Sequence, residues 1–214
     1  MNIKGVIFDL DGVLCFTDRY HTAAWKCLAE EIGIPFAEKT GDAVRGVSRM
    51  ESLDIVLGDN KGNYSPEQKI ELADRKNAIY REYLSTMTPS DVSAAVRSML
   101  EELKRRGIPM AIGSSSKNTL FILEKTGLTG YFSAIADGTQ ILKSKPDPEV
   151  FLLAAKKLGL RPEECCVLED AQAGIEAARR GGFISVAIGN AVRESEAEYH
   201  FAGAEELISI FANI

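Results

Sequence analysis

Residues 6–21 read VIFDLDGVLCFTDRYH, and this stretch decides the fold class. The apolar run at residues 6–8 is followed by two aspartates, Asp9 and Asp11, and then by a glycine. Such a run is typical of a buried strand, where a carboxylate at the strand end is costly unless a counter-charge or hydrogen bonds compensate it. Because Asp-Gly is also common turn chemistry, both a plain turn and a functional site remain open for this pair.

The rest of the composition is that of an ordinary globular protein. The chain has 214 residues, of which 45% are hydrophobic and 26% are charged, enough to bury a core without a metal or disulfide staple. The net charge of −6 argues against nucleic acid or an anionic membrane as the main partner. Neither a signal peptide nor a membrane-spanning run is recognisable, and we expect a cytoplasmic protein.

The cysteines support the same compartment. Cys15, Cys27, Cys165 and Cys166 form no C-x-x-C pair, and there are only two histidines, so no structural zinc site can be assembled. We expect the adjacent Cys165 and Cys166 to be reduced and to lie on a buried strand.

Five short apolar, β-branched runs predict the sheet. They cover residues 3–10, 108–114, 133–137, 165–170 and 183–189, and helical periodicity fills the gaps between the later runs. Near-continuous apolar strands that alternate with helices indicate a parallel sheet covered on both faces. The expected fold class is therefore α/β, a doubly wound, Rossmann-like core.

A helical insertion interrupts this alternation. Residues 17–107 contain no convincing strand, and their periodicity predicts helices near 20–32, 50–57 and 66–84. We expect a core domain of residues 1–16 and 90–214 and a helical cap domain of residues 17–89, with residues 86–92 as the return linker. Local signals predict a capping box at Ser65, and a helix capped by Asp147 that ends at Gly159.

Three further groups of residues point to the same edge of the predicted sheet. Glu169 and Asp170 end the fourth apolar run, so they and the first acidic pair would form a site for a hard cation such as Mg²⁺. The segment GSSSKN, residues 113–118, follows the second strand and offers hydroxyls and free N–H groups at a helix start, which suit phosphate. Lys145 follows the third strand. Taken one at a time, the serines would more simply be interpreted as a helix N-cap, and Lys145 as a solvated surface lysine.

Together these residues resemble the haloacid dehalogenase superfamily. DLDGV, the serine after the second strand, Lys145-Pro146 and EDAQAGIEAA occur in the order of that superfamily, and the insertion is similar to its small caps. Further stretches resemble the β-phosphoglucomutases within it, in a likeness that covers nearly the whole chain and weakens after about Gly189: RYHTAAWKCLAEEIG, RGVSRMESL, RKNAIYREYL, SSSKN and LTGYFSAIADG.

The resemblance implies a set of catalytic roles. Asp9 would be the nucleophile that carries phosphate, and Asp11 the general acid and base for the sugar hydroxyl. Ser114 and Lys145 would bind the transferring phosphoryl group. The implied ligands of one Mg²⁺ ion per subunit are Asp9, Asp11 through its backbone carbonyl, Glu169 and Asp170.

The resemblance also implies which residues bind the sugar phosphate. Arg49 would clamp the non-reacting phosphate, His21 would position Asp11, and Trp25 would form an apolar wall. Without the resemblance, a His and a Trp four residues apart are more typical of core packing, and Arg49 of a surface position. The implied substrate-binding residues are Thr17, His21, Trp25, Arg45, Gly46, Val47, Ser48, Arg49, Ser52, Lys76, Ser115, Ser116, Lys117 and Asn118.

The expected activity follows from this resemblance. It implies a monomeric Mg²⁺-dependent phosphomutase that interconverts β-D-glucose 1-phosphate and β-D-glucose 6-phosphate, with β-glucose 1,6-bisphosphate as intermediate and activator. A sugar-phosphate phosphatase on the same core and a catalytically silent binding module are the alternatives. Phe16, Ser115 and Arg45 depart from the usual pattern, which leaves the exact hexose and anomer open.

Overall fold

The computed structural model describes residues 3–44, 48–189, 195–203, 206 and 208–209. The chain divides into two compact units, an α/β unit of Met1–Phe16 and Thr88–Ile214 and a helical unit of Thr17–Met87. The sequence places the return to the core at residue 90, inside the short 3-10 helix η2 (Pro89–Asp91). That the helical unit acts as a cap stays a prediction.

The α/β unit is built on a six-stranded sheet of order β3-β2-β1-β4-β5-β6, in which all neighbours are parallel. Its strands are β1 (Gly5–Phe8), β2 (Met110–Gly113), β3 (Ala134–Ala136), β4 (Cys165–Glu169), β5 (Ile184–Ile188) and β6 (Tyr199–Phe201). Every residue of β1, β2, β4 and β5 is buried, as expected for a sheet covered on both faces.

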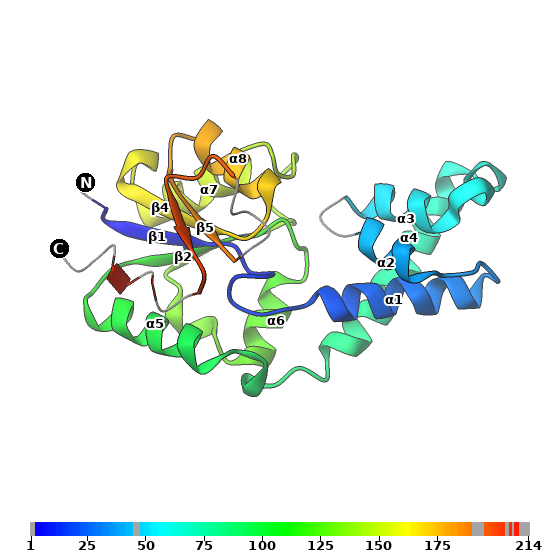
Figure 1. The fold of residues 1–214 in the computed structure, drawn as a ribbon, viewed down its shortest axis with the longest axis horizontal. Coiled ribbons are helices and arrows are strands. Elements are labelled where there is room, and N and C mark those ends of the chain that lie inside the picture. Colours follow the sequence, from blue (N-terminus) through cyan, green and yellow to red (C-terminus); the bar gives the residue numbers. More distant parts are fainter. Residues whose placement is uncertain (1–2, 45–47, 190–194, 204–205, 207, 210–214) are drawn as a thin grey trace. The chain divides into compact units, whose positions relative to one another are not determined.

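Helices cover the two faces in pairs. Figure 1 shows α5 and α6 on one side of the sheet and α7 and α8 on the other; α7 packs against β2 and β3, and α8 packs against β4 and β5. Right-handed crossovers from β1 outward to β3, and from β4 outward to β5, require this division. The doubly wound α/β fold is thus confirmed. The helices are α5 (Ala94–Arg105), α6 (Thr119–Thr126), α7 (Glu149–Leu158) and α8 (Gln172–Arg180), with short 3-10 turns η3 (Thr129–Tyr131) and η4 (Pro162–Glu164).

The helical unit has its own core. Its elements are α1 (Asp18–Glu31), α2 (Glu38–Ala43), α3 (Arg49–Leu57), η1 (Gly58–Asn63) and α4 (Pro66–Leu84). The long helices α1 and α4 pack along each other and bury Trp25, Leu28, Tyr80 and Leu84. The predicted capping box is confirmed: the Ser65 hydroxyl accepts from the backbone N–H of Gln68, whose side chain accepts from the N–H of Ser65.

Local prediction was off by one residue at one helix start. The assigned N-cap of α7 is Pro148, not Asp147. The Asp147 carboxylate nevertheless accepts a hydrogen bond from the N–H of Glu149 at 3.1 Å, the kind of bond that a capping side chain makes at a helix start. Gly159 ends α7 as predicted, in the left-handed conformation at φ 71°.

Besides the short 3-10 helices, the helix α2 and the edge strand β6 escaped prediction. The four cysteines are all free, and Cys165 and Cys166 are buried on β4, as expected. Within the described residues, we find no helix of the length and apolar character needed to span a bilayer.

Candidate active site

The carboxyl edge of the sheet gathers the acidic residues around β1 and β4. The two strands pair in parallel with Phe8 opposite Leu168, and the N–H of Asp9 donates to the carbonyl of Leu168 at 2.9 Å. Asp9 therefore continues the ladder for one residue beyond β1 and lies beside the end of β4. This is where the strand order reverses, with β2 on one side of β1 and β4 on the other, the place where open parallel sheets bind ligands.

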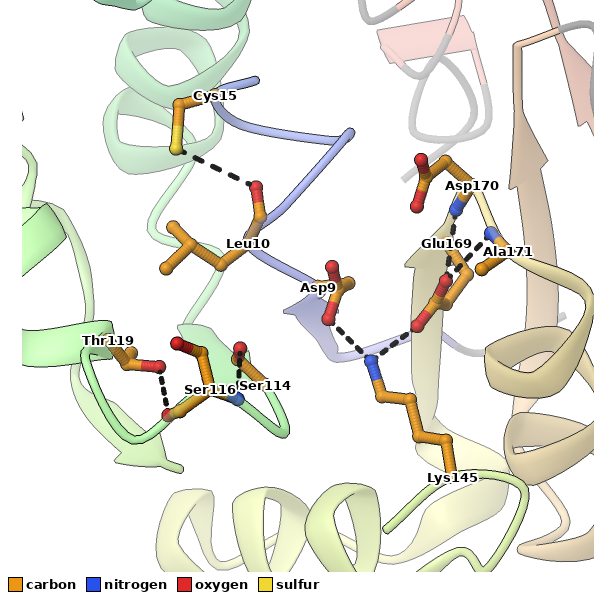
Figure 2. Close-up of polar contacts among 10 residues, drawn as sticks. All are labelled: Asp9, Leu10, Cys15, Ser114, Ser116, Thr119, Lys145, Glu169, Asp170 and Ala171. Atoms are coloured by element: carbon orange, nitrogen blue, oxygen red, sulfur yellow. Dashed lines mark hydrogen bonds and ion pairs between the residues drawn. The ribbon is translucent and has the colours of Figure 1, made fainter. Parts of the chain in front are cut away.

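Lys145 bridges two buried carboxylates at this edge (Figure 2). Its Nζ donates to Asp9 Oδ1 at 2.5 Å and to Glu169 Oε1, and the side chains of Lys145 and Asp9 are each only 10% exposed. Burial raises the pKa of Asp9 well above its ordinary value; Lys145 opposes this rise, while the charges of Glu169 and Asp11 add to it. Burial works to lower the pKa of Lys145, but the two carboxylates outweigh it and raise that pKa above the usual value. The lysine is therefore a firmly charged ammonium.

Glu169 has its other oxygen occupied as well. Its Oε2 accepts from the N–H groups of Asp170 and Ala171, both at 3.0 Å. Gly174 on α8 makes this position possible, because a Cβ there would lie 1.9 Å from the Glu169 carboxyl carbon. Glu169 is thus a fixed partner of Lys145 as well as a member of the acidic cluster.

The loop after β1 brings the second aspartate to the site. It closes on itself through hydrogen bonds from the N–H of Gly12 to the Cys15 carbonyl at 2.8 Å and from the Cys15 thiol to the Leu10 carbonyl. Gly12 has φ +83°, and a Cβ there would meet an Asp170 carboxylate oxygen at 1.8 Å. A glycine is therefore required where this loop passes Asp170. Asp11 is half-buried in the same loop.

The carboxylates fit a hard divalent cation. One oxygen from each of Asp9, Glu169 and Asp170 lies within 4.8 Å of the others, and oxygen ligands of this kind suit Mg²⁺. Lys145 forms ion pairs with two of these carboxylates, those of Asp9 and Glu169. The oxygen ligands of the cluster are thus of the kind that suits a divalent cation.

The loop after β2 forms a compact set of hydroxyls next to this edge. The Ser114 hydroxyl accepts from the N–H of Ser116 at 3.1 Å, and the Ser116 hydroxyl accepts from the N–H of Asn118 at 3.2 Å. Thr119 donates its hydroxyl to the Ser116 carbonyl at 2.9 Å, as Figure 2 shows. The Ser115 hydroxyl is buried without a hydrogen-bond partner in the described structure. We call residues 114–118 the phosphate loop, after the role that the sequence predicts for them; Lys117 in it is exposed and Asn118 is buried.

In the helical unit, half-buried His21 and buried Lys76 form a polar pair among aromatic rings. Lys76 Nζ lies 2.8 Å from His21 Nδ1 and sits over the rings of Trp25 and Tyr80, at 4.7 and 4.8 Å from their centroids. Burial and the charges of Lys76 and Arg49 lower the pKa of His21 to about 3. His21 is therefore neutral, with Nδ1 accepting from the ammonium and the proton on Nε2.

The remaining predicted residues of the helical unit occupy the start of α3 and of α1. Ser48 caps α3 in a capping box with Glu51, and Arg49 donates to Asn77 on α4 at 3.1 Å. The Ser52 hydroxyl donates to the Val44 carbonyl at 3.3 Å. Thr17 is buried at the N-cap of α1. The predicted residues Arg45, Gly46 and Val47 lie outside the described residues.

The structure thus brings Asp9, Lys145, Glu169 and Asp170 together in the α/β unit, and His21, Trp25 and Lys76 together in the helical unit. Sequence reasoning missed Tyr80, which stacks on His21 with centroids 3.9 Å apart; its spacing of four from Lys76 was a usable signal. It also missed Gly12 and Gly174: the first needs its missing side chain because of Asp170, far away in the chain, and the second because of Glu169, five positions earlier.

Comparisons with known proteins agree with this geometry. A model of the haloacid dehalogenase-like hydrolases matches residues 3–182. The chain is 41% identical to a β-phosphoglucomutase of Bacillus subtilis over 87% of its own length and 84% of the relative. It is 32% identical to a phosphorylated carbohydrates phosphatase of Thermotoga maritima over 84% and 82% of the two chains. A crystal structure of β-phosphoglucomutase from Clostridium difficile superposes with a TM-score of 0.87 at 37% identity, covering 96% and 93% of the two chains.

Proposed function

The chain belongs to the haloacid dehalogenase-like hydrolase family, and from this premise we propose that it is a Mg²⁺-dependent phosphomutase that interconverts β-D-glucose 1-phosphate and β-D-glucose 6-phosphate. One observation carries the proposal. The buried carboxylate of Asp9 lies where the strand order of the sheet reverses, 2.5 Å from Lys145, and together with Glu169 and Asp170 it forms a cluster that could hold a metal ion. Phosphoryl transfer needs mainly such positioning and charge neutralisation.

Asp9 is the nucleophile in this proposal. One of its carboxylate oxygens attacks the phosphorus of β-glucose 1,6-bisphosphate, an O–P bond forms, and the P–O bond to the sugar breaks. The aspartyl-phosphate then passes its phosphoryl group to the free hydroxyl of a sugar monophosphate, which regenerates Asp9 and the bisphosphate. Lys145 balances the charge of the transferring group as a compact ammonium, and Ser114 donates to the same group.

Asp11 is the general acid and base. It gives a proton to the sugar oxygen when the P–O bond breaks and takes the proton from the accepting hydroxyl in the reverse sense. His21, neutral and with its proton on Nε2, is suited to position Asp11 and the sugar. The residues that would hold Mg²⁺ are Asp9, Asp170, the carbonyl of Asp11 and, assisting, Glu169. When bound, the ion neutralises charge on the phosphoryl oxygens.

The sugar and its second phosphate would be bound by two groups of residues. Arg49 presents a guanidinium that can contact a phosphate at two points, and Asn77 orients it from α4. The proposed sugar-phosphate contacts are Thr17, His21, Trp25, Arg45, Gly46, Val47, Ser48, Arg49, Ser52 and Lys76 from the helical unit, and Ser115, Ser116, Lys117 and Asn118 from the phosphate loop.

A coupled assay tests the proposal. Purified protein is given β-glucose 1-phosphate, α-glucose 1-phosphate or β-galactose 1-phosphate, each with Mg²⁺ and a trace of β-glucose 1,6-bisphosphate, and hexose 6-phosphate is measured. We expect turnover with β-glucose 1-phosphate. Turnover with none of the three sugars would refute the mutase assignment.

The role of Asp11 has its own test. Asp11→Asn keeps the backbone carbonyl proposed for the metal but removes the proton acceptor, so Mg²⁺ affinity should persist while turnover falls about 10²–10⁴-fold. Asp59→Asn, at an exposed carboxylate of the helical unit, is the matched control and should behave as wild type. Near-wild-type turnover of Asp11→Asn would exclude it as the acid and base.

A sugar-phosphate phosphatase is the second candidate, favoured by the 32% identity to the phosphatase of T. maritima. Water would then replace the sugar hydroxyl as acceptor of the phosphoryl group on Asp9. If inorganic phosphate is released from the bisphosphate faster than the isomer forms, the phosphatase is the correct assignment. The monomeric state and the cytoplasmic location stay predictions, the first open to light scattering.

A further inference from the structure

The phosphate loop is tied to the turn that follows β3. The N–H of Ser114 donates to the carbonyl of Ala136 at 3.1 Å, and the N–H of Gly138 donates to the carbonyl of Ser116 at 3.1 Å. The Asp137 carboxylate holds the turn itself, since Oδ1 accepts from both the N–H and the hydroxyl of Thr139. Two successive loops at the sheet edge are therefore joined backbone to backbone.

At Gly138 this contact leaves no room for a side chain. A Cβ there would lie 2.2 Å from the carbonyl oxygen of Ser115, 2.9 Å from its carbonyl carbon and 3.1 Å from the N of Lys117. All three are backbone atoms, so no side-chain rotation relieves the clash. Gly138 is buried and is absent from the glycines with positive φ, so the contact and not its own backbone conformation demands a glycine.

We propose that Gly138 is a positioning residue for phosphoryl transfer: its missing side chain sets where the phosphate loop lies and thereby where the transferring phosphate is held. The inference rests on the proposed function of the loop. Because hydrogen bonds from Ser114 through Ser116 to Asn118 and Thr119 join the loop internally, a push at Ser115 moves the loop as a unit.

The size of the push follows from the clash. A Cβ needs about 1 Å more than the 2.2 Å present before it reaches an ordinary contact with a carbonyl oxygen. A misplacement of about 1 Å at a reacting group costs about 10²-fold in rate. The carboxylates of Asp9 and Asp170 follow β1 and β4, which β2 separates from β3, so the proposed metal site keeps its geometry.

The test compares Gly138→Ala with Gly130→Ala in the full chain. Gly130 is an exposed glycine of the same unit with no positive φ, and no atom of the described residues lies within 4 Å of a built Cβ, so its variant controls for the added methyl group. The affinities for inorganic phosphate and for Mg²⁺ are measured by calorimetry, phosphate in the presence of Mg²⁺, together with turnover and the far-ultraviolet circular dichroism spectrum.

For Gly138→Ala we expect phosphate affinity at least tenfold weaker, turnover about 10²-fold lower, and Mg²⁺ affinity within twofold of wild type. Gly130→Ala should match wild type in all three. A folded Gly138→Ala with phosphate affinity within twofold of wild type would overturn the inference, and so would an equal loss of phosphate and Mg²⁺ affinity, since that marks general damage.

A second variant decides the matter if Gly138→Ala does not fold. Thr119→Val removes the hydroxyl that holds the Ser116 carbonyl without adding an atom at the turn, and should weaken phosphate binding alone; unchanged phosphate affinity would overturn the inference. Failure of the proposed function is seen separately, as absence of mutase turnover in the wild-type protein, because phosphate affinity is read without any sugar substrate.

Discussion

Replacing Lys145 by methionine is the most direct test of the buried charge arrangement. The substitution keeps an unbranched apolar stem, which can still pack on Phe151, whose ring centroid lies 4.6 Å from Nζ. It removes the single ammonium between Asp9 and Glu169. Two carboxylates that are 10% and 2% exposed then face each other without a counter-charge.

The expected cost follows from that burial. Removing one partner of a buried ion pair destabilises a protein by about 3–5 kcal/mol, because the remaining charge is left desolvated. For a chain of this length, that corresponds to a fall in melting temperature of about 6–20 °C at 2–4 °C per kcal/mol. Added Mg²⁺ should restore part of the loss, since the ion would neutralise the acidic cluster.

The matched control is Lys143→Met in the same loop. The Lys143 side chain is 73% exposed and lies 3.5 Å from Asp147, so its ion pair is expected to be worth about 0–1 kcal/mol. Both variants are unfolded in urea at pH 7, with chelator and with Mg²⁺. Circular dichroism follows the whole chain, because Trp25, the single tryptophan, lies in the helical unit and reports on that unit alone.

The outcome separates a charge effect from a packing effect. Lys145→Met should unfold at clearly lower urea than Lys143→Met and should show no mutase turnover. If the two variants unfold at the same urea concentration in chelator, the buried carboxylates do not depend on Lys145, and the electrostatic account of this site is wrong.

Three further changes have defined outcomes. Gly12→Ala should displace the Asp170 carboxylate, which lies 1.8 Å from the built Cβ, and should lower the affinity for Mg²⁺ at least tenfold, as measured by calorimetry. An unchanged affinity would contradict this. Gly174→Ala should displace Glu169 and lower turnover. The affinity for phosphate is measured to confirm that the phosphate loop is intact. Turnover equal to that of the wild type would show that Glu169 can move without loss of activity. His21, with its folded pKa near 3 against 6.5 unfolded, should cost the wild type about 1.4 kcal/mol per pH unit as pH falls below 6.5, because only the unfolded state takes up the proton. His21→Gln should remove this pH dependence of the free energy of unfolding, measured by urea unfolding followed through Trp25 fluorescence. An equal pH dependence in both proteins would refute the assignment to His21.

The strands and the acidic edge were predictable because their signals are local. A run such as residues 165–168 is apolar at every position, and in a sheet covered on both faces that pattern belongs to a central parallel strand. Since parallel strands end at one edge, the aspartates after β1 and the acids at the end of β4 had to lie near each other. The β6 strand was not predictable: Tyr199–Phe201 alternates between partly buried and exposed residues and has one neighbour.

The helical unit shows the same limit. Periodicity located its long helices, and the capping box at Ser65 set the start of α4. The short helix α2 has only six residues, EKTGDA, without an apolar stripe. That His21 is held by Lys76, 55 positions away, depends on how α1 packs along α4, which neither helix encodes alone.

The sequence by itself determined the α/β class, the helical insertion and the residue types available for phosphate and metal chemistry, because periodicity and strand-end chemistry depend on neighbours in the chain. Only the tertiary structure decided which charges meet. Lys145 follows β3, Asp9 follows β1 and Glu169 ends β4, and their pairing and shifted pKa values come from burial that the packed sheet edge creates. The need for glycine at residues 12 and 138 has the same origin, because what would collide with a side chain there is a group that is distant in the chain and brought near only by folding.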